Sequence, residues 1–269
     1  MSVDNKTKTI LITGASSGIG YEFAKIFARH KYRLILTARD KAKLDIIKDE
    51  FEYQYKTQTI ILTKDLSDIN EVNAIYEYIK LNNISIDILI NSAGSGVYGK
   101  FNGTDFTKES DMIKVNILAL TYLTKIILRE MLKNNSGSII NVASTAGFKP
   151  GPLMSVYYAT KAYVLSFSES IAAEIRDTNV SLTVLCPGPT RTDFMKKSSY
   201  SAVKDLKFKK LQTASEVALY GYKAMLRKEL IAIPGISNRV STLLLKFFPR
   251  KLFADLMFRM KNRKDNIPG

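Results

Sequence analysis

The sequence predicts an α/β fold: one doubly wound domain in which a seven-stranded parallel sheet carries helices on both faces, followed by a helical C-terminal extension. Two observations predict it. Seven short apolar or β-branched runs alternate with longer amphipathic stretches, and these runs are almost continuously apolar, as in strands buried on both faces. With 269 residues, of which 46% are hydrophobic, the chain can build one large core.

The predicted elements follow one another in a regular order. The strands are expected at Thr9–Thr13, Arg33–Ala38, Thr59–Thr63, Ile86–Asn91, Ser138–Ala143, Val180–Cys186 and Leu230–Ile233. The helices are expected at Ile19–His30, Lys41–Tyr53, Ile69–Leu81, Lys108–Lys133, Ser155–Asp177 and Ser215–Arg227. No linker, repeat or low-complexity segment interrupts this order, so residues 1–233 are assigned to one domain and residues 234–269 to a basic amphipathic extension of it.

The composition limits the chemistry. The single cysteine, Cys186, cannot form an internal disulfide, which favours a reducing compartment. One cysteine and one histidine, His30, also exclude multi-cysteine and histidine-rich metal sites, so no metal is expected. Any catalysis must therefore run largely without histidine.

The net charge of +15 does not by itself indicate a nucleic-acid partner. Many of the cations alternate with apolar residues at helix spacing, as in Lys41-Ala42-Lys43-Leu44, which is typical of a solvated helix face. No apolar run approaches the roughly 18 residues of a membrane span. The N-terminus lacks the pattern of a signal peptide, because Ile10–Ile12 is short and runs into glycines. We expect a cytoplasmic protein.

A glycine-rich turn follows the first predicted strand. Gly14 permits a tight turn, and Gly18 and Gly20 let the backbone approach a phosphate and let the next helix pack closely. The start of that helix adds unpaired N–H groups and a partial positive charge. The turn thus predicts a dinucleotide site made by Gly14, Ser16, Ser17, Gly18, Ile19 and Gly20.

The end of the second strand selects the cofactor. NAD sites place an acid there for the ribose 2′-hydroxyl, whereas NADP sites place a cation near the 2′-phosphate. Ala38 stands where the acid is expected, and the guanidinium of Arg39 can pair with a phosphate. Asp40 argues for NAD, but it is equally suited to cap the helix that starts at Lys41. We predict NADP(H).

A tyrosine and a lysine form a candidate acid/base pair that needs no histidine. Tyr157 and Lys161 lie four residues apart and so share one helix face. Tyr157 comes thirteen residues after Ser144, which stands at the end of the fifth strand. A neighbouring ammonium is expected to lower the pKa of the phenol, which allows proton transfer to or from a substrate oxygen. Ser144 could bond the same oxygen.

The same spacing occurs once more, in a different place. Tyr76 and Lys80 are also four residues apart, with Thr63 thirteen residues before Tyr76. This pair follows the third strand, which a 3-2-1-4-5 strand order puts at the outer side of the sheet. We therefore expect Tyr76 on a solvated helix face, without a catalytic role.

Together these motifs resemble those of one family. Thr13–Gly20, Asn91-Ser92-Ala93-Gly94, Asn116, Ser144, Tyr157-x-x-x-Lys161 and Pro187-Gly188 stand in the order and spacing of the short-chain dehydrogenase/reductases. The resemblance covers about residues 7–233. It implies a Rossmann fold that reduces a carbonyl or oxidises an alcohol with a nicotinamide dinucleotide.

The resemblance also implies roles for single residues. Tyr157 would be the acid/base, Lys161 would also bond the nicotinamide ribose, and Ser144 would polarise the carbonyl. Asn116 would hold a water in a proton relay. The implied cofactor contacts are Asp65 and Leu66 at the adenine, Asn91 in the central strand, Thr192 at the carboxamide, and Ala93, Gly94, Pro187, Gly188 and Thr190 nearby. Two positions depart from the family pattern, Ser92 for Asn and Thr190 for Val or Ile, and neither touches the acid/base group.

The loops after strands four, five and six are expected to contact the substrate: Ser95–Phe106, Thr145–Met154 and Arg191–Ala214. The last is long enough to serve as a lid, with Phe194, Met195, Tyr200 and Phe208 and six lysines at 196, 197, 204, 207, 209 and 210; a solvated helix pair is the alternative. Phe148, Met154 and Phe194 in these loops indicate an apolar substrate.

The C-terminal extension carries an amphipathic stretch, with Leu252, Phe253, Leu256, Met257 and Met260 on one face and basic residues around it. Residues 243–264 could close the substrate pocket, pack between subunits, or lie on an anionic membrane as a peripheral contact. The family resemblance implies a homodimer or homotetramer. Two alternative functions stay open: a peripheral membrane ketoreductase for lipid or acyl carbonyls, and a dinucleotide-binding scaffold without catalysis, against which the intact Asn116, Ser144, Tyr157 and Lys161 argue.

Overall fold

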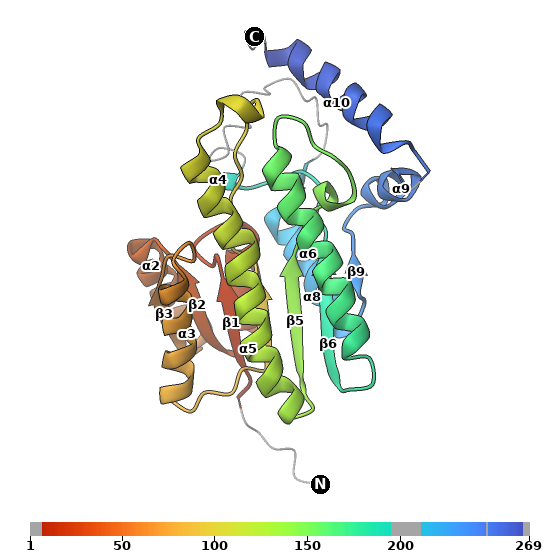
Figure 1. The fold of residues 1–269 in the computed structure, drawn as a ribbon. Helices are drawn as coiled ribbons and strands as arrows, with labels where there is room; N and C mark the ends of the chain where they lie inside the picture. Colours follow the sequence, from red (N-terminus) through yellow and green to blue (C-terminus); the bar gives the residue numbers. More distant parts are fainter. Residues whose placement is uncertain (1–6, 195–210, 246, 266–269) are drawn as a thin grey trace.

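The computed structural model describes residues 7–194, 211–245 and 247–265. Its main sheet has seven parallel strands in the order β3-β2-β1-β4-β5-β6-β9 (Figure 1). The strands are β1 (Thr9–Thr13), β2 (Arg33–Ala38), β3 (Thr59–Thr63), β4 (Ile88–Asn91), β5 (Gly137–Val142), β6 (Val180–Leu185) and β9 (Ile231–Ala232). The predicted fold class, a doubly wound parallel sheet of seven strands, is confirmed.

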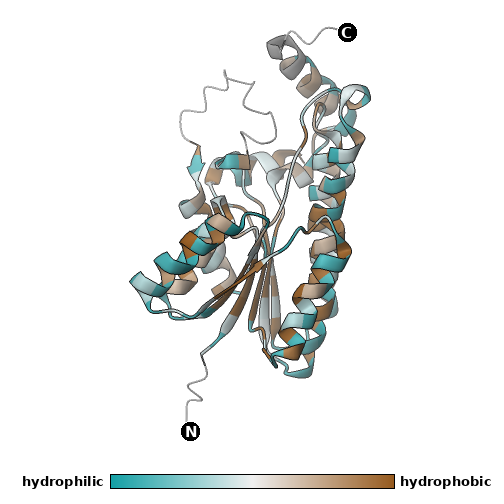
Figure 2. Ribbon diagram, turned by 90° about the vertical axis from the view of Figure 1, so that its left-hand side faces the viewer, coloured by the Kyte–Doolittle hydropathy of each residue, from teal (hydrophilic) through white to brown (hydrophobic). Residues whose placement is uncertain are grey.

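Helices cover both faces of the sheet, and Figure 2 shows the sheet between the two helical layers. The helices connecting the strands are α1 (Gly18–Arg29), α2 (Lys41–Tyr55), α3 (Ile69–Leu81), α4 (Phe106–Ile113), α5 (Leu120–Lys133), α6 (Ser155–Glu174) and α8 (Ala214–Leu226). One core lies under α1, α2 and α8, and a second lies under α3 and α5. All five residues of β1 are buried, as expected for a strand covered on both faces.

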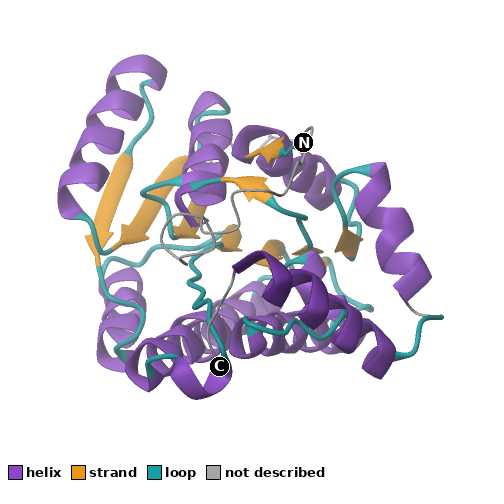
Figure 3. Ribbon diagram, turned by 90° about the horizontal axis from the view of Figure 1, so that it is seen from above, coloured by secondary structure: helices purple, strands orange, loops and turns teal. Residues whose placement is uncertain are grey.

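The carboxyl ends of the strands all lie at one end of the molecule, seen from above in Figure 3. Short elements follow these strand ends: the 3₁₀ turns Phe101–Gly103 and Thr145–Phe148, and the two-stranded parallel pair β7 (Thr190–Arg191) and β8 (Gln212–Thr213). The helices α9 (Ile236–Leu245) and α10 (Arg250–Asp265) lie at this end too. None of the helices in the described part of the chain has the length and hydropathy needed to cross a membrane.

The long helix predicted at Lys108–Lys133 is wrong in detail. The structure divides it into α4, a π-helical segment at Lys114–Ala119, and α5. The interruption surrounds Asn116, which is buried. π-Helical turns inside α-helices occur frequently at functional sites, and here the irregular segment lies beside the ends of the strands.

The expected lid lies mostly outside the described residues, which omit 195–210 and with them Met195, Tyr200, Phe208 and the six lysines. At its two ends the structure describes β7 and β8, which pair Thr190 with Gln212 and Arg191 with Thr213. Phe194, at the start of the loop, is described and half-buried.

Candidate active site

The glycine turn after β1 packs tightly on its surroundings. Gly14 has φ +67° and Gly18 has φ +58°, a backbone region that favours glycine. A methyl group on Gly14 would lie 2.8 Å from Ala93 Cα, and one on Gly20 would overlap the carbonyl oxygen of Gly14. The turn therefore tolerates no side chain at these positions.

The start of α1 leaves hydrogen-bonding capacity unused. Ser17 is the N-cap residue, but its hydroxyl makes no cap hydrogen bond. The first turn contains no acidic residue that would neutralise the positive end of the helix dipole. Gly18, Ile19 and Gly20 form this first turn. The N–H groups of a helix start, a hydroxyl that caps none of them, and two glycines in the first turn fit the pyrophosphate of a dinucleotide.

Hydrogen bonds join this turn to the end of β4. Thr13 Oγ1 accepts from the backbone N–H groups of Ser92 and Ala93 at 3.0 and 3.1 Å. Asn91 Nδ2 donates to Asn141 Oδ1 of β5 at 2.9 Å and to Thr124 Oγ1 of α5 at 3.0 Å. The central strands are thereby fixed side by side where the glycine turn meets them.

The predicted adenosine contacts lie together at the ends of β2 and β3. The Arg39 side chain is 71% exposed, and its Nη1 lies 3.7 Å from Asp65 Oδ2. Burial alone would raise the pKa of Asp65, but hydrogen bonds from Ser67 and the charge of Arg39 hold it below its ordinary value. Leu66, the next residue, is buried.

Asp40, the argument for NAD, is engaged in the protein. Its carboxylate accepts from the backbone N–H of Lys43 at 3.1 Å and caps α2. It also pairs with the Lys43 ammonium at 3.4 Å. The exposed cation at this strand end is thus Arg39, while the neighbouring carboxylate stabilises the helix.

Ser144, Tyr157 and Lys161 meet at the end of β5. Ser144 directly follows the strand and caps the 3₁₀ turn by accepting from Ala146 N at 3.1 Å. Its hydroxyl also donates to Pro187 O at 3.3 Å and is hydrogen-bonded to Tyr157. Tyr157 and Lys161 lie one turn apart on α6, with the buried Lys161 ammonium 5.9 Å from the centroid of the Tyr157 ring.

Burial controls the protonation of both groups. It raises the pKa of Tyr157 to about 12, and only the hydrogen bond with Ser144 acts against it. Burial also lowers the pKa of Lys161 to about 8. The net shift of the Tyr157 pKa is therefore upward, opposite to the lowering that we expected from the neighbouring ammonium, because burial outweighs it. The ammonium lies over the ring and donates to Val142 O at 2.8 Å.

Asn116 connects three parts of the site. Its Oδ1 accepts from Ser95 N at 3.0 Å, and its Nδ2 donates to Ser95 O at 3.1 Å and to Thr160 Oγ1 at 3.0 Å. Thr160 Oγ1 in turn donates to Tyr157 O at 2.7 Å. Both N–H groups of the amide are used, so the side chain ties the loop after β4 to the helix that carries Tyr157.

Gly94 leaves the space in which these residues meet. A methyl group on it would lie 3.3 Å from Asn116 Oδ1 and 3.6 Å from Lys161 Nζ.

The segment after β6 approaches the glycine turn from the other side. Pro187 O accepts from Thr145 N at 2.9 Å, and Thr190 Oγ1 donates to Gly188 O at 2.9 Å. A methyl group on Gly18 would lie 3.3 Å from Thr192 Cγ2. A hollow of about 320 Å³ lies where the start of α1, the segment after β6 and the start of α8 meet. Its lining residues are Gly18, Glu22, Arg191, Thr192, Asp193 and Ala214.

The sequence analysis did not predict the partners of Asn116, which are the backbone of Ser95 and the hydroxyl of Thr160. Thr160 directly precedes Lys161, and a threonine inside a helix beside a proposed catalytic lysine is a weak signal that could have found it. Ser95 acts through its backbone, for which the sequence carries no signal.

The second Tyr-x-x-x-Lys pair stays apart from the site. Tyr76 lies on α3, which covers the sheet on the β3 side (Figure 1). The expectation of a solvated face is wrong for Tyr76, whose ring is half-buried against the core under α3 and α5. An amphipathic phenol can cover apolar surface and keep its hydroxyl at the edge. His30, at the far end of α1, is exposed and stacks on Tyr222.

Phe194 forms a wall beside the phenol. Its ring centroid lies 5.3 Å from that of Tyr157. A methyl group on Gly96 would lie 2.7 Å from Phe194 Cζ and 3.4 Å from Met154 Cε. Phe194, Gly96 and Met154 thus come from three different loops and meet beside the ring of Tyr157.

We expect Phe194→Ala to widen this wall. Removing the ring should raise kcat/KM for ketones with a bulky aryl substituent relative to acetone by about tenfold or more, since pocket contacts of this size discriminate by that order. The ratio of the two kcat/KM values measures the effect. Tyr53→Ala, which removes a 79% exposed ring from α2, is the matched control. An unchanged ratio in Phe194→Ala would exclude Phe194 from the substrate pocket.

The fold and this edge of the sheet are those of a dinucleotide-dependent oxidoreductase. Residues 8–202 match the family model for short chain dehydrogenase, and the chain belongs to this family. It is 34% identical over 197 residues to an NADP-dependent 3-hydroxy acid dehydrogenase from Schizosaccharomyces pombe, covering 70% of this chain and 73% of the relative.

Two solved structures are similar over most of their length. A short-chain dehydrogenase from Sphingobium yanoikuyae in complex with NADPH has a TM-score of 0.79 and 31% identity, covering 88% of this chain and 92% of that chain. A bulky-bulky ketone specific alcohol dehydrogenase from Comamonas testosteroni has a TM-score of 0.77 and 29% identity, covering 89% and 91%. The family resemblance inferred from the motifs is confirmed.

Proposed function

We propose that the protein interconverts a carbonyl and an alcohol with NADP(H), and that Tyr157 is the acid/base. The observation that carries the proposal is the meeting of Ser144, Tyr157 and Lys161 near a glycine turn whose helix start is uncapped by side chains and carries no acidic residue in its first turn. A scaffold without catalysis would have no need for a buried lysine next to a buried phenol, because each group costs free energy to bury.

NADP(H) is proposed as the cofactor because Arg39 offers an exposed cation and Asp40 is used as a helix cap. The similar proteins from Schizosaccharomyces pombe and Sphingobium yanoikuyae are named with NADP and NADPH. The cofactor supplies the hydride when bound. Gly14, Ser16, Ser17 and Gly18 would hold its pyrophosphate, and Pro187, Gly188 and Thr192 would contact the nicotinamide side, since Thr192 packs against Gly18.

The protein's own residues handle the oxygen of the substrate. In the reductive direction Tyr157 Oη donates its proton to the oxygen as negative charge develops there, and Ser144 Oγ holds the same oxygen by a hydrogen bond. Lys161 keeps a positive charge over the ring of Tyr157, which stabilises the phenolate that remains. Asn116 is a positioning residue, since it fixes the helix turn that carries Tyr157.

The proposal is tested by following the oxidation of NADPH and NADH in the presence of aldehydes, ketones and acyl carbonyls. We expect turnover with NADPH and at least one carbonyl, and a lower kcat/KM with NADH. Absence of turnover across the panel, with NADPH binding intact, would favour a binding scaffold.

The substrate proposed is an apolar carbonyl, because Phe194 and Met154 stand beside Tyr157. The relative from Comamonas testosteroni is named as specific for bulky-bulky ketones, which agrees with an apolar wall. Lipid or acyl carbonyls are the alternative. A higher kcat/KM for long-chain 3-oxoacyl substrates than for aryl ketones would favour it.

We also propose a homodimer or homotetramer assembled through the outer faces of α5 and α6. On α6, Tyr163 is 38% exposed and stacks on Phe167. The Tyr163 hydroxyl lies 3.0 Å from Thr121 Oγ1 of α5, so the two helices share one outer surface. Mass measurement by light scattering tests this, and a monomer at all concentrations would contradict it.

The pH dependence of ketone reduction follows from the two shifted groups. Tyr157, with a pKa raised to about 12, keeps its proton through the neutral and mildly alkaline range, so the acid stays available. Lys161, with a pKa lowered to about 8, loses its charge as the pH rises through that value. We expect kcat/KM for reduction to be flat below about pH 8 and to fall above it. A fall that begins in the acidic range would contradict the assignment.

A further inference from the structure

Helix α9 presents an apolar face that no described part of the chain covers. Exposed apolar residues recur along one face of α9 and the turn after it, at spacings of three and four residues, with Leu243 and Leu244 adjacent: Ile236, Val240, Leu243, Leu244 and Phe247. Leu244 is 63% exposed and Phe247 is 83% exposed. Exposed apolar residues are common one at a time, but a contiguous group on one face indicates an interaction site.

The opposite side of α9 is fixed to the site. Thr242 is buried, and Asn238 Nδ2 donates to Pro234 O at 2.7 Å. A methyl group on Gly188 would lie 2.6 Å from the Asn238 amide, so α9 packs directly on the segment after β6. The exposed face is therefore held outward by contacts on its inner side.

Helix α10 extends the apolar face and adds positive charge. Leu252, Leu256 and Met260 are exposed at spacings of four residues and form a stripe along the helix. Arg250, Lys251 and Arg259 are exposed beside it. Residues 236–265 contain eight basic and two acidic residues, a net charge of +6.

Aromatic contacts fix the inner side of α10. The Lys149 ammonium lies 5.4 Å from the centroid of the Phe253 ring, and Phe253 packs edge-on against Phe248 at 6.4 Å. Lys149 belongs to the loop after β5, directly beyond the turn that Ser144 caps. The helix is thus attached to the substrate side of the domain, and its apolar stripe faces away.

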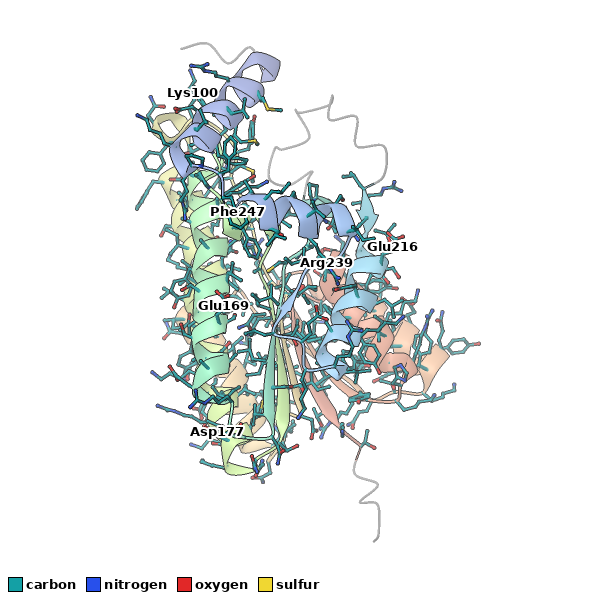
Figure 4. The ribbon with its side chains drawn as sticks, turned by 90° about the vertical axis from the view of Figure 1, so that its right-hand side faces the viewer. Lys100, Glu169, Asp177, Glu216, Arg239 and Phe247 are labelled. Atoms are coloured by element: carbon teal, nitrogen blue, oxygen red, sulfur yellow. The ribbon has the colours of Figure 1, made fainter. Side chains whose placement is uncertain are left out.

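Both helices lie at the end of the molecule to which the strands point. Figure 4 shows Phe247 and Lys100 at this end with α10, and Asp177 at the opposite end. The carboxyl ends of the strands, which carry Ser144, open toward the same side (Figure 1). A surface bound to α9 and α10 would therefore face the entrance of the candidate active site.

We propose that α9 and α10 form a docking surface for an anionic lipid bilayer. Their apolar residues enter the boundary between headgroups and acyl chains, and their arginines and lysines contact the anionic headgroups. The combination of large apolar residues on one face with cations beside it is typical of helices that lie in a membrane interface. The proposal concerns binding and does not depend on the reaction.

Charge favours a bilayer over a second copy of the chain as the occupant. A two-fold contact through this face would bring the exposed cations Arg250, Lys251 and Arg259 toward their own copies, with Asp255 as the one exposed acidic residue in the described part of α10. Like charges brought together in this way cost free energy, whereas an anionic surface attracts them. An anionic bilayer also offers an apolar layer for Leu244 and Phe247.

The test is co-sedimentation of the full chain with phosphatidylcholine vesicles that contain or lack phosphatidylglycerol. We expect binding to the vesicles with phosphatidylglycerol, little binding to the others, and a decrease with added salt. Two double variants each remove one contribution to binding. Leu244→Ser with Phe247→Ser removes apolar side chains, and Arg250→Glu with Lys251→Glu removes positive charge. Each should weaken binding to phosphatidylglycerol vesicles by about tenfold or more.

Lys80→Glu with Leu81→Ser is the matched control. It makes the same kinds of change on α3, at the other end of the molecule, where Leu81 is 79% exposed. It should bind vesicles like the unchanged chain. NADPH oxidation with a water-soluble ketone in the absence of vesicles should be equal in all these proteins, which separates docking from catalysis.

Three results would overturn the proposal. In the first, the unchanged chain binds neither kind of vesicle. In the second, both double variants bind phosphatidylglycerol vesicles as well as the unchanged chain does. Alternatively, Leu244→Ser with Phe247→Ser could lower the mass measured by light scattering while no vesicle binding is seen, which would assign the face to a contact between copies of the chain.

Discussion

Tyr157→Phe is expected to abolish turnover while NADPH binding stays nearly intact. The substitution removes only the hydroxyl, so the ring still packs 5.3 Å from Phe194 and lies beneath the Lys161 ammonium. What is lost is the proton donor and the hydrogen bond with Ser144. General acid catalysis contributes about 10²- to 10⁴-fold, so kcat for ketone reduction should fall by at least that order. NADPH fluorescence measures the binding, and stopped-flow NADPH oxidation measures the rate.

Tyr76→Phe is the control, because it changes the other Tyr-x-x-x-Lys pair in the same way. Tyr76 packs against the core under α3 and α5 and lies outside the cluster around Ser144, so its variant should keep full activity. If Tyr157→Phe retained turnover within about tenfold of the unchanged enzyme, another group would have to supply the proton. If it lost NADPH binding as well, its defect would be structural.

The two tyrosines show what the sequence could and could not predict. Their spacing is identical, and the strand order separated them, because a parallel sheet brings β5 next to β4 and keeps β3 at the edge. The order is that of the doubly wound fold, which the alternation of buried runs with amphipathic stretches predicted, and β1, β2 and β3 begin and end at the predicted residues. Strongly apolar runs bounded by polar residues leave little freedom in assigning such strands.

The start of the fourth strand is a boundary that hydrophobicity alone did not predict. The structure begins β4 at Ile88, two residues after the predicted start at Ile86. Asp87 lies between them, and its carboxylate accepts from the backbone N–H of Thr9 at 2.7 Å. A side chain that completes the hydrogen bonding of a neighbouring strand cannot be inferred from the hydrophobicity of its own segment.

The π-helical segment around Asn116 also could not be predicted from the hydrophobicity of its own segment. Apolar periodicity over Lys108–Lys133 fits an uninterrupted helix, and six residues with a different period hardly change it. The partners of Asn116, Ser95 and Thr160, come from the loop after β4 and from α6. Likewise, burial by tertiary contacts sets the pKa of Tyr157. The predicted direction of its pKa shift, a lowering, is wrong for this reason.

Arg39→Asp is expected to reverse the cofactor preference from NADPH to NADH. The substitution removes the exposed cation at the end of β2 and puts a carboxylate there, which repels a 2′-phosphate and can accept from a ribose 2′-hydroxyl. A charge-assisted hydrogen bond contributes about 1.5–3 kcal/mol, which corresponds to roughly 10- to 100-fold in kcat/KM for NADPH. The ratio of kcat/KM for the two cofactors, with one ketone held constant, measures the effect.

Arg39→Gln separates the two causes of the Arg39→Asp effect. Glutamine removes the cation without adding repulsion, so kcat/KM for NADPH should fall while that for NADH stays nearly unchanged. Lys80→Asp applies the same change in net charge to an exposed position on α3 and should leave the ratio unaltered, which excludes a general effect of charge. The 3.7 Å pair between Arg39 and Asp65 would be lost in both Arg39 variants, so any adenine contact made by Asp65 would weaken equally for both cofactors. A ratio that does not move in Arg39→Asp would therefore exclude Arg39 as the group that selects NADP(H).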